Sequence, residues 1–207
     1  MKRAPPRPTV RRPNVSRAVR RLIRDISRCL PELSHVRAER ILVIAGEARR
    51  ASRATVRPLR FESGSRRTPS GGRKPKVTFR GTDMLYVITL RPLFFRASTP
   101  EKRVESILHE LFHVSPRFDG TLANDRRHQA LPGPKFESAL RPLVRRYLAA
   151  CPDELLAPLR LNGDVVARQW LEKPPGSYRL GSHVRKRYDE THTFLGPVRM
   201  ITRATRH

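Results

Sequence analysis

The stretch SILHELFHVSPRFDG, residues 106–120, places two histidines four positions apart, with a glutamate directly after the first. On a helix, positions i and i+4 lie on one face about one turn apart, so the imidazoles of His109 and His113 can bind one metal ion. The spacing matches the H-E-x-x-H pattern of zinc sites, in which the glutamate is the general base. Glu110 lies about 100° around the helix from His109, where its carboxylate can take a proton from a water molecule activated by Zn2+. The alternative interpretation is an ordinary helix that carries two surface histidines.

A catalytic zinc site needs a third protein ligand, and four downstream residues are candidates. His128 is favoured because it lies in the loop NDRRHQALPGPKFE, where an imidazole at a helix entrance can fold back onto the first helix. Glu137 inside the next helix, and Asp119 and Asp125 in the loop, are the alternatives. Asp119 has a second expected role, in which its carboxylate accepts a hydrogen bond from a ligating imidazole and fixes the orientation of the ring.

Predicted helices and strands surround this motif. Thr99 can cap a helix over 100–114 that has Pro100 in its first turn and is stopped by Ser115 and Pro116, and a second helix is predicted over 134–150. Apolar or alternating runs predict strands at 39–48, 54–62 and 83–90, and Pro58 places the second of them at a sheet edge or bulge. Because strand 83–90 directly precedes the motif helix, we expect Tyr86 to Leu90 to line the substrate cleft. The oxyanion stabiliser stays open among Arg127, Tyr147 and the histidines.

A resemblance to a known family covers roughly residues 38–145. The run VRPLRFE … MLYVITLRPLFFRASTPEKRVESILHELFHVSPRFDG … RRHQ … FE resembles the phage-type metallopeptidase family, which is HExxH zincin-like and distantly SprT-like. The resemblance implies a zinc-dependent peptidase acting on protein or peptide substrates, with these matching positions: His109, Glu110, His113 and His128. SprT-like proteases have a glycine after their later histidine, whereas Gln129 follows His128 here, so that comparison is an analogy.

The predicted fold class is α+β and zincin-like, with a small mixed or antiparallel sheet packed on the HExxH helix and the following helix. Three regions are expected, namely a disordered basic arm over 1–15, the metallopeptidase domain over 16–150, and a β-rich extension or tail over 151–207. Within the last region, the segment LLAPLRLNGDVVARQWL is expected to form two short strands around the turn NGD. A helix over 16–30 is expected to pack outside the sheet.

The charge of the chain is strongly positive and uneven. The net charge is +26, with 23 Lys/Arg against 5 Asp/Glu in residues 1–80 and 21 against 13 in residues 81–207. This excess favours contact with nucleic acid through the basic N-terminal region, although a generally arginine-rich composition explains it equally well. The two cysteines have no partner spacing for a zinc ribbon, and no run is apolar enough for a membrane span, so a cytoplasmic protein is expected.

Two function hypotheses follow from these features. The first is a zinc metallopeptidase that hydrolyses peptide bonds with Glu110 as general base. The second is a basic nucleic-acid-binding or phage-accessory protein whose zinc site is structural or degenerate. Replacement of Glu110 by glutamine separates them, because hydrolysis should stop in the first case and nothing important should change in the second.

Overall fold

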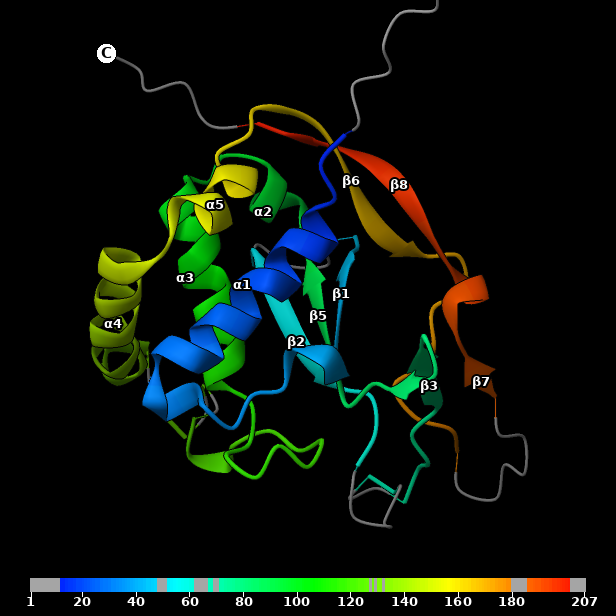
Figure 1. Ribbon diagram of the computed structural model, residues 1–207. Helices are drawn as coiled ribbons and strands as arrows, with labels where there is room; N and C mark the ends of the chain where they lie inside the picture. Colours follow the sequence, from blue (N-terminus) through cyan, green and yellow to red (C-terminus); the bar gives the residue numbers. More distant parts are fainter. Residues whose placement is uncertain are drawn as a thin grey trace, which may run out of the picture.

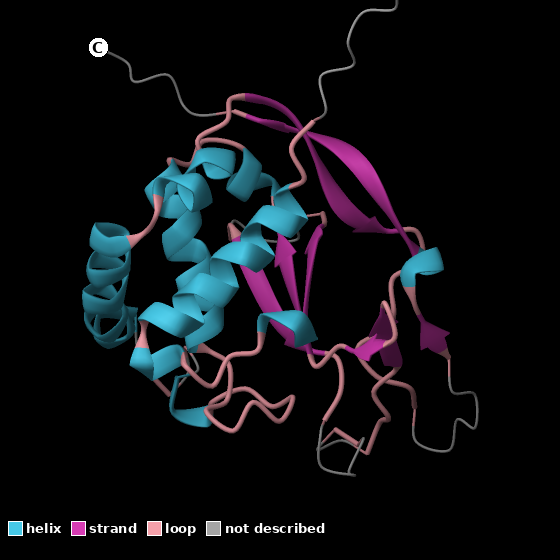
Figure 2. Ribbon diagram, in the orientation of Figure 1, coloured by secondary structure: helices cyan, strands magenta, loops and turns pink. Residues whose placement is uncertain are grey.

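The computed structural model describes residues 12–47, 52–61, 67–68, 71–126, 128, 130–131, 133–179 and 186–201. Helices gather on one side of a small central sheet, and further strands lie on the other side, as Figures 1 and 2 show. The described helices are α1 Val15–Cys29, α2 Pro92–Phe95, α3 Pro100–Phe112, α4 Gly133–Ala150 and α5 Asp153–Leu156. The described strands are β1 Ile41–Ala45, β2 Ala54–Pro58, β3 Lys76–Phe79, β4 Thr82–Asp83, β5 Tyr86–Leu90, β6 Gly163–Trp170, β7 Arg187–Tyr188 and β8 Thr193–Met200.

The central sheet has the strand order β1-β5-β2 and is mixed, because β5 runs parallel to β1 and antiparallel to β2. Successive side chains of a strand point to opposite faces, and β5 follows this rule. Tyr86 and Ile88 belong to the large core under the helices, whereas Val87 belongs to a smaller core shared with β3 and β7. The predicted α+β class with a small mixed sheet is therefore confirmed.

The position of β5 in this sheet contradicts the expectation that residues 86–90 line the substrate cleft. Both neighbours of β5 are occupied, by β1 and by β2, so its backbone groups are already paired. Strand β2 has only one partner among the described strands, so it forms an edge of the sheet. Pro58 lies in that strand, and the inference from Pro58 to an edge is confirmed.

Helix α3 begins as its sequence predicts. The Thr99 side chain accepts a hydrogen bond from the backbone N–H of Lys102 at 3.2 Å, and Pro100 occupies the first turn. Its apolar stripe is completely buried, namely Val104, Ile107, Leu108 and Leu111. Helix α3 packs against α4, α1 and the edge strand β2, so the helix that carries the histidine pair is held from several sides.

Helix α1 lies within the main core and is not peripheral, because Val19, Leu22 and Ile23 on its inner face are completely buried. Asn14 caps it by accepting a hydrogen bond from the N–H of Arg17 at 2.9 Å. Figure 1 shows α1 crossing in front of the central sheet. Among the described residues, no helix combines the length and the apolar character that crossing a bilayer requires.

The expectation of two strands around the turn NGD is wrong. Residues before the turn form α5 and a 3-10 turn over Ala157–Leu159, because three leucines at helical spacing (Leu155, Leu156 and Leu159) are buried together. The segment after the turn is the strand β6, which pairs along its whole length with β8. Val165 and Met200 of these strands belong to the main core. The division of the chain into three regions stays a prediction.

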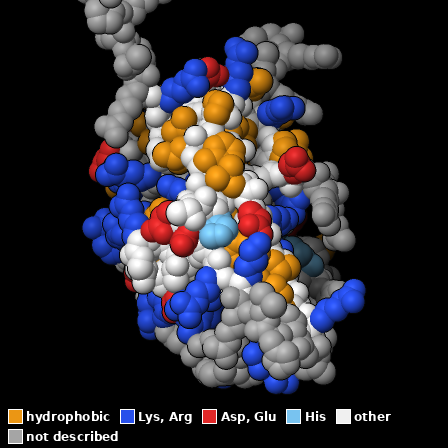
Figure 3. Space-filling view, turned by 90° about the vertical axis from the view of Figure 1, so that its right-hand side faces the viewer, with side chains coloured by type: hydrophobic (Ala, Val, Ile, Leu, Met, Phe, Trp, Pro, Cys, Tyr) orange, Lys and Arg blue, Asp and Glu red, His pale blue; other side chains and the backbone are white. Residues whose placement is uncertain are grey.

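The outer surface of the β6–β8 ribbon is partly apolar. Figure 3 shows hydrophobic side chains gathered on the upper part of the molecule seen from that side. The large hydrophobic side chains that are exposed among the described residues all lie on or beside this ribbon: Leu171, Phe194, Leu195 and Ile201.

Candidate active site

The C-terminal turn of α3 presents the histidine pair to the loop that follows it. The chain turns back after Val114, which forms a bridge with Leu122, and the N–H of Ala123 donates to the carbonyl of His113 at 2.9 Å. The Tyr86 hydroxyl of β5 fixes the same loop, because it accepts from the N–H of Gly120 at 2.9 Å and donates to a loop carbonyl at 2.8 Å. These contacts direct the chain from α3 back over the histidine pair.

The returning loop brings a third imidazole to the pair. The Nε2 atom of His109 lies 3.2 Å from Nε2 of His128 and 3.3 Å from Nε2 of His113. In a tetrahedral zinc site, bond lengths of about 2.0–2.1 Å put neighbouring ligand nitrogens about 3.3–3.4 Å apart. These two separations are those that one bound metal ion requires, and all three imidazoles offer a ligand atom within 4.8 Å of the others, so the cluster fits such an ion.

The second nitrogen of His113 fixes which tautomer that ring adopts. Its Nδ1 lies 2.7 Å from the carbonyl oxygen of Arg126, and a carbonyl can only accept a hydrogen bond. Nδ1 therefore carries the proton and Nε2 keeps its lone pair toward His109 and His128. The sequence predicts that the Asp119 carboxylate accepts this hydrogen bond from a ligating imidazole. The structure instead places the Arg126 carbonyl against His113, and Asp119 accepts hydrogen bonds from the backbone N–H and hydroxyl of Thr121.

The other candidates for a third ligand do not join the cluster. Among the described residues, the His, Cys, Asp and Glu side chains that lie close enough together to hold a metal ion are His109, His113 and His128. Glu137 is on the exposed side of α4 and pairs with Arg141 at 3.7 Å. Asp125 is largely exposed, with its carboxylate 4.0 Å from the Arg126 side chain.

Phe136 of α4 is the common neighbour of the three imidazoles. Its ring centroid lies 4.6 Å from that of His109, 5.0 Å from that of His113 and 4.9 Å from that of His128. The side chain is 2% exposed, so it covers one side of the cluster and restricts ring movement there. Sequence reasoning missed this role, since nothing in the local sequence separates Phe136 from an ordinary core aromatic residue.

Glu110 lies between α3 and the edge strand β2. Its Oε2 accepts a hydrogen bond from the backbone N–H of Val56 at 2.7 Å, which leaves Oε1 available for another partner. Burial raises the pKa of Glu110 to about 7, against smaller downward effects of the Val56 N–H and of Arg91. The contact with Val56 spans more than fifty residues and has no sequence signal.

Burial affects the histidines in the opposite direction. It lowers the pKa of His109 to about 4, with further lowering by the neighbouring His113 and His128, and it also lowers the pKa of His113. Both imidazoles are therefore neutral at pH 7, which is the form that offers a lone pair to a metal ion.

The contacts of Tyr147 exclude it from the candidates for the oxyanion stabiliser. Arg127 lies outside the described residues. Tyr147 does not point to the cluster: its hydroxyl is buried and donates to Asp25 of α1 at 2.9 Å. That bond joins α4 to α1, so Tyr147 has a structural partner and is removed from the candidates.

A comparison with known protein families gives a match over the segment that carries this site. A family model described as "Putative phage metallopeptidase" matches residues 9–140, which is more than half of the chain. No curated protein and no solved structure matches the chain. The matched segment includes the whole histidine cluster and Glu110. The chain therefore belongs to the phage metallopeptidase family.

Proposed function

We propose that the protein is a zinc-dependent peptidase with a zincin-like site, in which His109, His113 and His128 hold Zn2+ and Glu110 is the general base. The single observation that carries this proposal is the convergence of three imidazole Nε2 atoms, with neighbouring separations of 3.2 and 3.3 Å, beside a buried glutamate. Three nitrogen ligands with a free fourth position are typical of catalytic zinc. The family assignment supports a metal-dependent peptidase in general terms.

Bound Zn2+ would supply Lewis-acid chemistry, polarising the scissile carbonyl and lowering the pKa of a water molecule. Glu110 then takes the proton of the attacking water at its carboxylate and passes it to the nitrogen of the departing amine. A pKa near 7 suits both transfers, because such a carboxylate accepts and releases a proton at neutral pH. The Val56 N–H holds Oε2 in place, so the transfer is assigned to Oε1.

The edge strand β2 is the proposed docking strand for an extended peptide. Backbone groups of an antiparallel strand alternate between the partner strand and the open side. The N–H of Leu59 and the carbonyl of Arg53 bond to the β5 side, whereas the N–H of Val56 points away to Glu110. Ala54 shares the orientation of Val56, so its N–H and carbonyl face the open edge beside the general base. A peptide paired there would pass close to the histidine cluster.

Metal content tests the ligand set directly. We expect purified wild-type protein to bind one equivalent of Zn2+, and His109→Ala and His128→Ala to lose it. Glu137→Gln is the matched control, because Glu137 lies in the adjacent helix outside the cluster and should leave the metal content unchanged. Full zinc retention by both histidine variants would refute the ligand assignment.

Hydrolysis tests the role of Glu110 and separates the peptidase from a protein with a structural metal site. Glu110→Gln keeps the shape of the side chain and its acceptor for the Val56 N–H, so zinc should stay bound. Hydrolysis of an unfolded protein substrate should fall by at least 100-fold, within the range of general-base effects of about 10²–10⁴. Unchanged hydrolysis in this variant would exclude Glu110 as the base, and absence of hydrolysis in zinc-loaded wild type would favour the structural site.

A further inference from the structure

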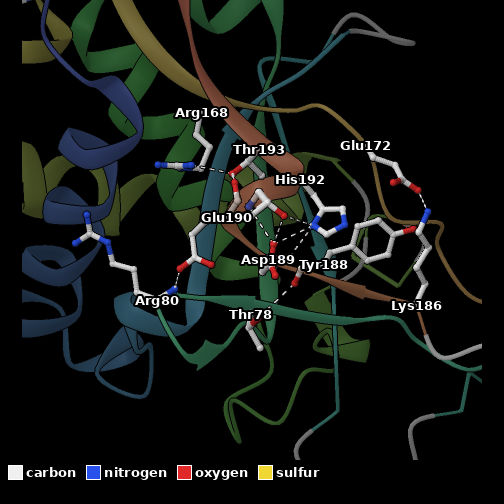
Figure 4. A network of polar contacts seen from close by, with 11 residues as sticks. Thr78, Arg80, Arg168, Glu172, Lys186, Tyr188, Asp189, Glu190, His192 and Thr193 are labelled. Carbon is white, nitrogen blue, oxygen red and sulfur yellow. Dashed lines mark hydrogen bonds and ion pairs between the residues drawn. The ribbon is translucent and has the colours of Figure 1, made fainter.

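A cluster of guanidinium groups lies on the part of the surface formed by α1, β6 and the β3–β4 turn. The three side chains Arg20, Arg80 and Arg168 surround the Phe79 ring, with guanidinium carbons 5.8, 5.8 and 4.5 Å from its centroid. They come from α1, from the turn after β3 and from β6. Figure 4 shows the Arg80 and Arg168 side chains extending toward the helix coloured blue. Positions far apart in the sequence therefore place like charges around one ring.

The outer side of α1 continues this cluster. Arg17, Arg21 and Arg24 are exposed and follow the spacing i, i+4 and i+7, so they form one stripe along the helix. Figure 3 shows Lys and Arg side chains gathered along the left edge of the molecule, the side on which α1 lies. We call the combined surface the arginine face: Arg17, Arg20, Arg21, Arg24, Arg80 and Arg168.

Few negative charges balance the arginine face. None of its six arginines forms an ion pair with a carboxylate among the described residues. Two carboxylates lie close to this face: that of Glu190 accepts from the backbone N–H of Arg80, and that of Glu154 lines the same pocket as Arg17 and Arg21. The one acid of α1, Asp25, is turned inward and bonded to Tyr147. Burial lowers the pKa of Arg20, and repulsion from the neighbouring guanidiniums of Arg80, Arg24 and Arg17 lowers it further.

Arg80 is held in a backbone conformation that other residue types adopt more easily. Its φ is 51° and that of the following Gly81 is 74°, as in the tight two-residue turns that favour Asn-Gly. The Arg80 guanidinium extends over Phe79, the ring that Arg20 and Arg168 also contact. Unfavourable backbone geometry of this kind is concentrated at functional sites.

We propose that the arginine face binds the phosphate backbone of nucleic acid without reading its sequence. The stripe from Arg17 to Arg24 is about 10 Å long, at about 1.5 Å per residue. That length covers about three phosphates of one strand, at about 3.4 Å per nucleotide along the duplex axis. Arginine side chains that are already packed against Phe79 lose little further conformational freedom when they bind phosphates. Such a fixed arrangement suits a stiff polyanion with regularly spaced phosphates. This surface is distinct from the N-terminal arm over 1–15, whose expected nucleic-acid contact stays a prediction.

Duplex binding measured against salt tests the proposal. The affinity of the full chain for a fluorescent 30-base-pair DNA duplex is measured by anisotropy between 50 and 300 mM salt, about the range where phosphate contacts dominate. The variant Arg24→Gln with Arg80→Asn removes two contacts, and asparagine fits the turn at position 80. Each lost phosphate contact should lower the log–log salt slope by about 0.9, so the double variant should lose about 1.8 and bind about 60-fold more weakly at 100 mM.

A matched control has the same charge change elsewhere. Arg141 and Arg145 are exposed on α4, which lies on the opposite side of the molecule from β3 in Figure 1. Their double replacement by glutamine should leave the slope within about 0.5 of wild type. Equal weakening by both double variants would show binding to net charge alone and overturn the assignment. The assignment would also be overturned if the protein did not bind the duplex, or if it bound anionic lipid vesicles or polyglutamate more strongly than the duplex. Loss of duplex binding on metal chelation would overturn it as well.

Discussion

Replacement of Phe136 by alanine tests whether the site depends on the packing of its histidines. The ring is 2% exposed and lies within 5.0 Å, centroid to centroid, of all three imidazoles. Truncating a buried phenylalanine typically costs about 3–5 kcal/mol in the free energy of unfolding. For a chain of this size each kcal/mol lowers Tm by about 2–4 °C, so we expect Tm to fall by about 6–20 °C.

The same substitution should weaken metal binding separately from stability. Groups that orient metal ligands typically contribute about 10–100-fold in metal affinity, and Phe136 is in contact with every proposed ligand. Zinc affinity is measured by competition with a chromogenic chelator, at a temperature at least 20 °C below the Tm of each variant, a margin of about the largest expected loss. We expect Kd for Zn2+ to increase by about 10–100-fold.

Leu140→Ala is the matched control for Phe136→Ala. Leu140 lies one turn further along α4, is 5% exposed, and belongs to the same hydrophobic core, but it is not an aromatic partner of the imidazole rings. Its truncation should cost about 2–5 kcal/mol in stability and leave the zinc Kd unchanged. If both variants lose zinc affinity equally, or if Phe136→Ala binds zinc like wild type, then the ring does not position the ligands.

Three further predictions concern the metal, the general base and the contact between α1 and α4. A chelator should lower Tm of wild type by about 5–11 °C if zinc is present at about 100 times its Kd, because that occupancy stabilises the folded state by about 2.7 kcal/mol. His113→Ala should show no such response in a thermal melt. In chelator-treated protein, the pKa of Glu110 is about 7 in the folded state against 4.5 in the unfolded state. Between these values the folded state binds more protons than the unfolded state. The free energy of unfolding therefore falls by about 3 kcal/mol as the pH rises from below 4.5 to above 7. Glu110→Gln should remove that loss in urea unfolding at pH 5 and pH 8, and an unchanged difference between the two pH values would contradict the raised pKa. Tyr147→Phe leaves the buried Asp25 carboxylate without its 2.9 Å donor and should cost about 1–3 kcal/mol without changing zinc affinity.

Local patterns in the sequence predict the elements that carry the site. The cap at Thr99 and the buried stripe of α3 are present as expected, and the predicted helix 100–114 is observed as Pro100–Phe112. The expected juxtaposition of His128 with His109 and His113 is also present, although their role as ligands stays a prediction. These features depend on residues within about twenty positions of one another, where spacing along the chain limits the possible geometry.

Sequence patterns do not predict the contacts between segments that are far apart in the chain. Residues 86–90 form the most typical strand of the chain because they are central in the sheet and largely buried, and that position prevents them from pairing with a substrate. The edge strand β2 is more polar and less regular, and only Pro58 indicated its place. Phe136 and the Val56 N–H reach the site through the packing of α4 and β2 on α3, which no local pattern reports.

The burial of Glu110 favours the peptidase over a structural metal site. A structural site needs ligands that hold the ion, and Glu110 is not one of the three converging side chains. Glu110 is nevertheless buried, with 7% of the residue exposed, and its pKa is raised, so the folded state loses stability by keeping the carboxylate ionised. Replacement by an apolar side chain would avoid that loss while leaving the three imidazoles in place. In the proposed peptidase, a carboxylate with a pKa near 7 beside the three imidazoles has a role as the proton acceptor at a reacting carbonyl, whereas a purely structural zinc site gives it no role.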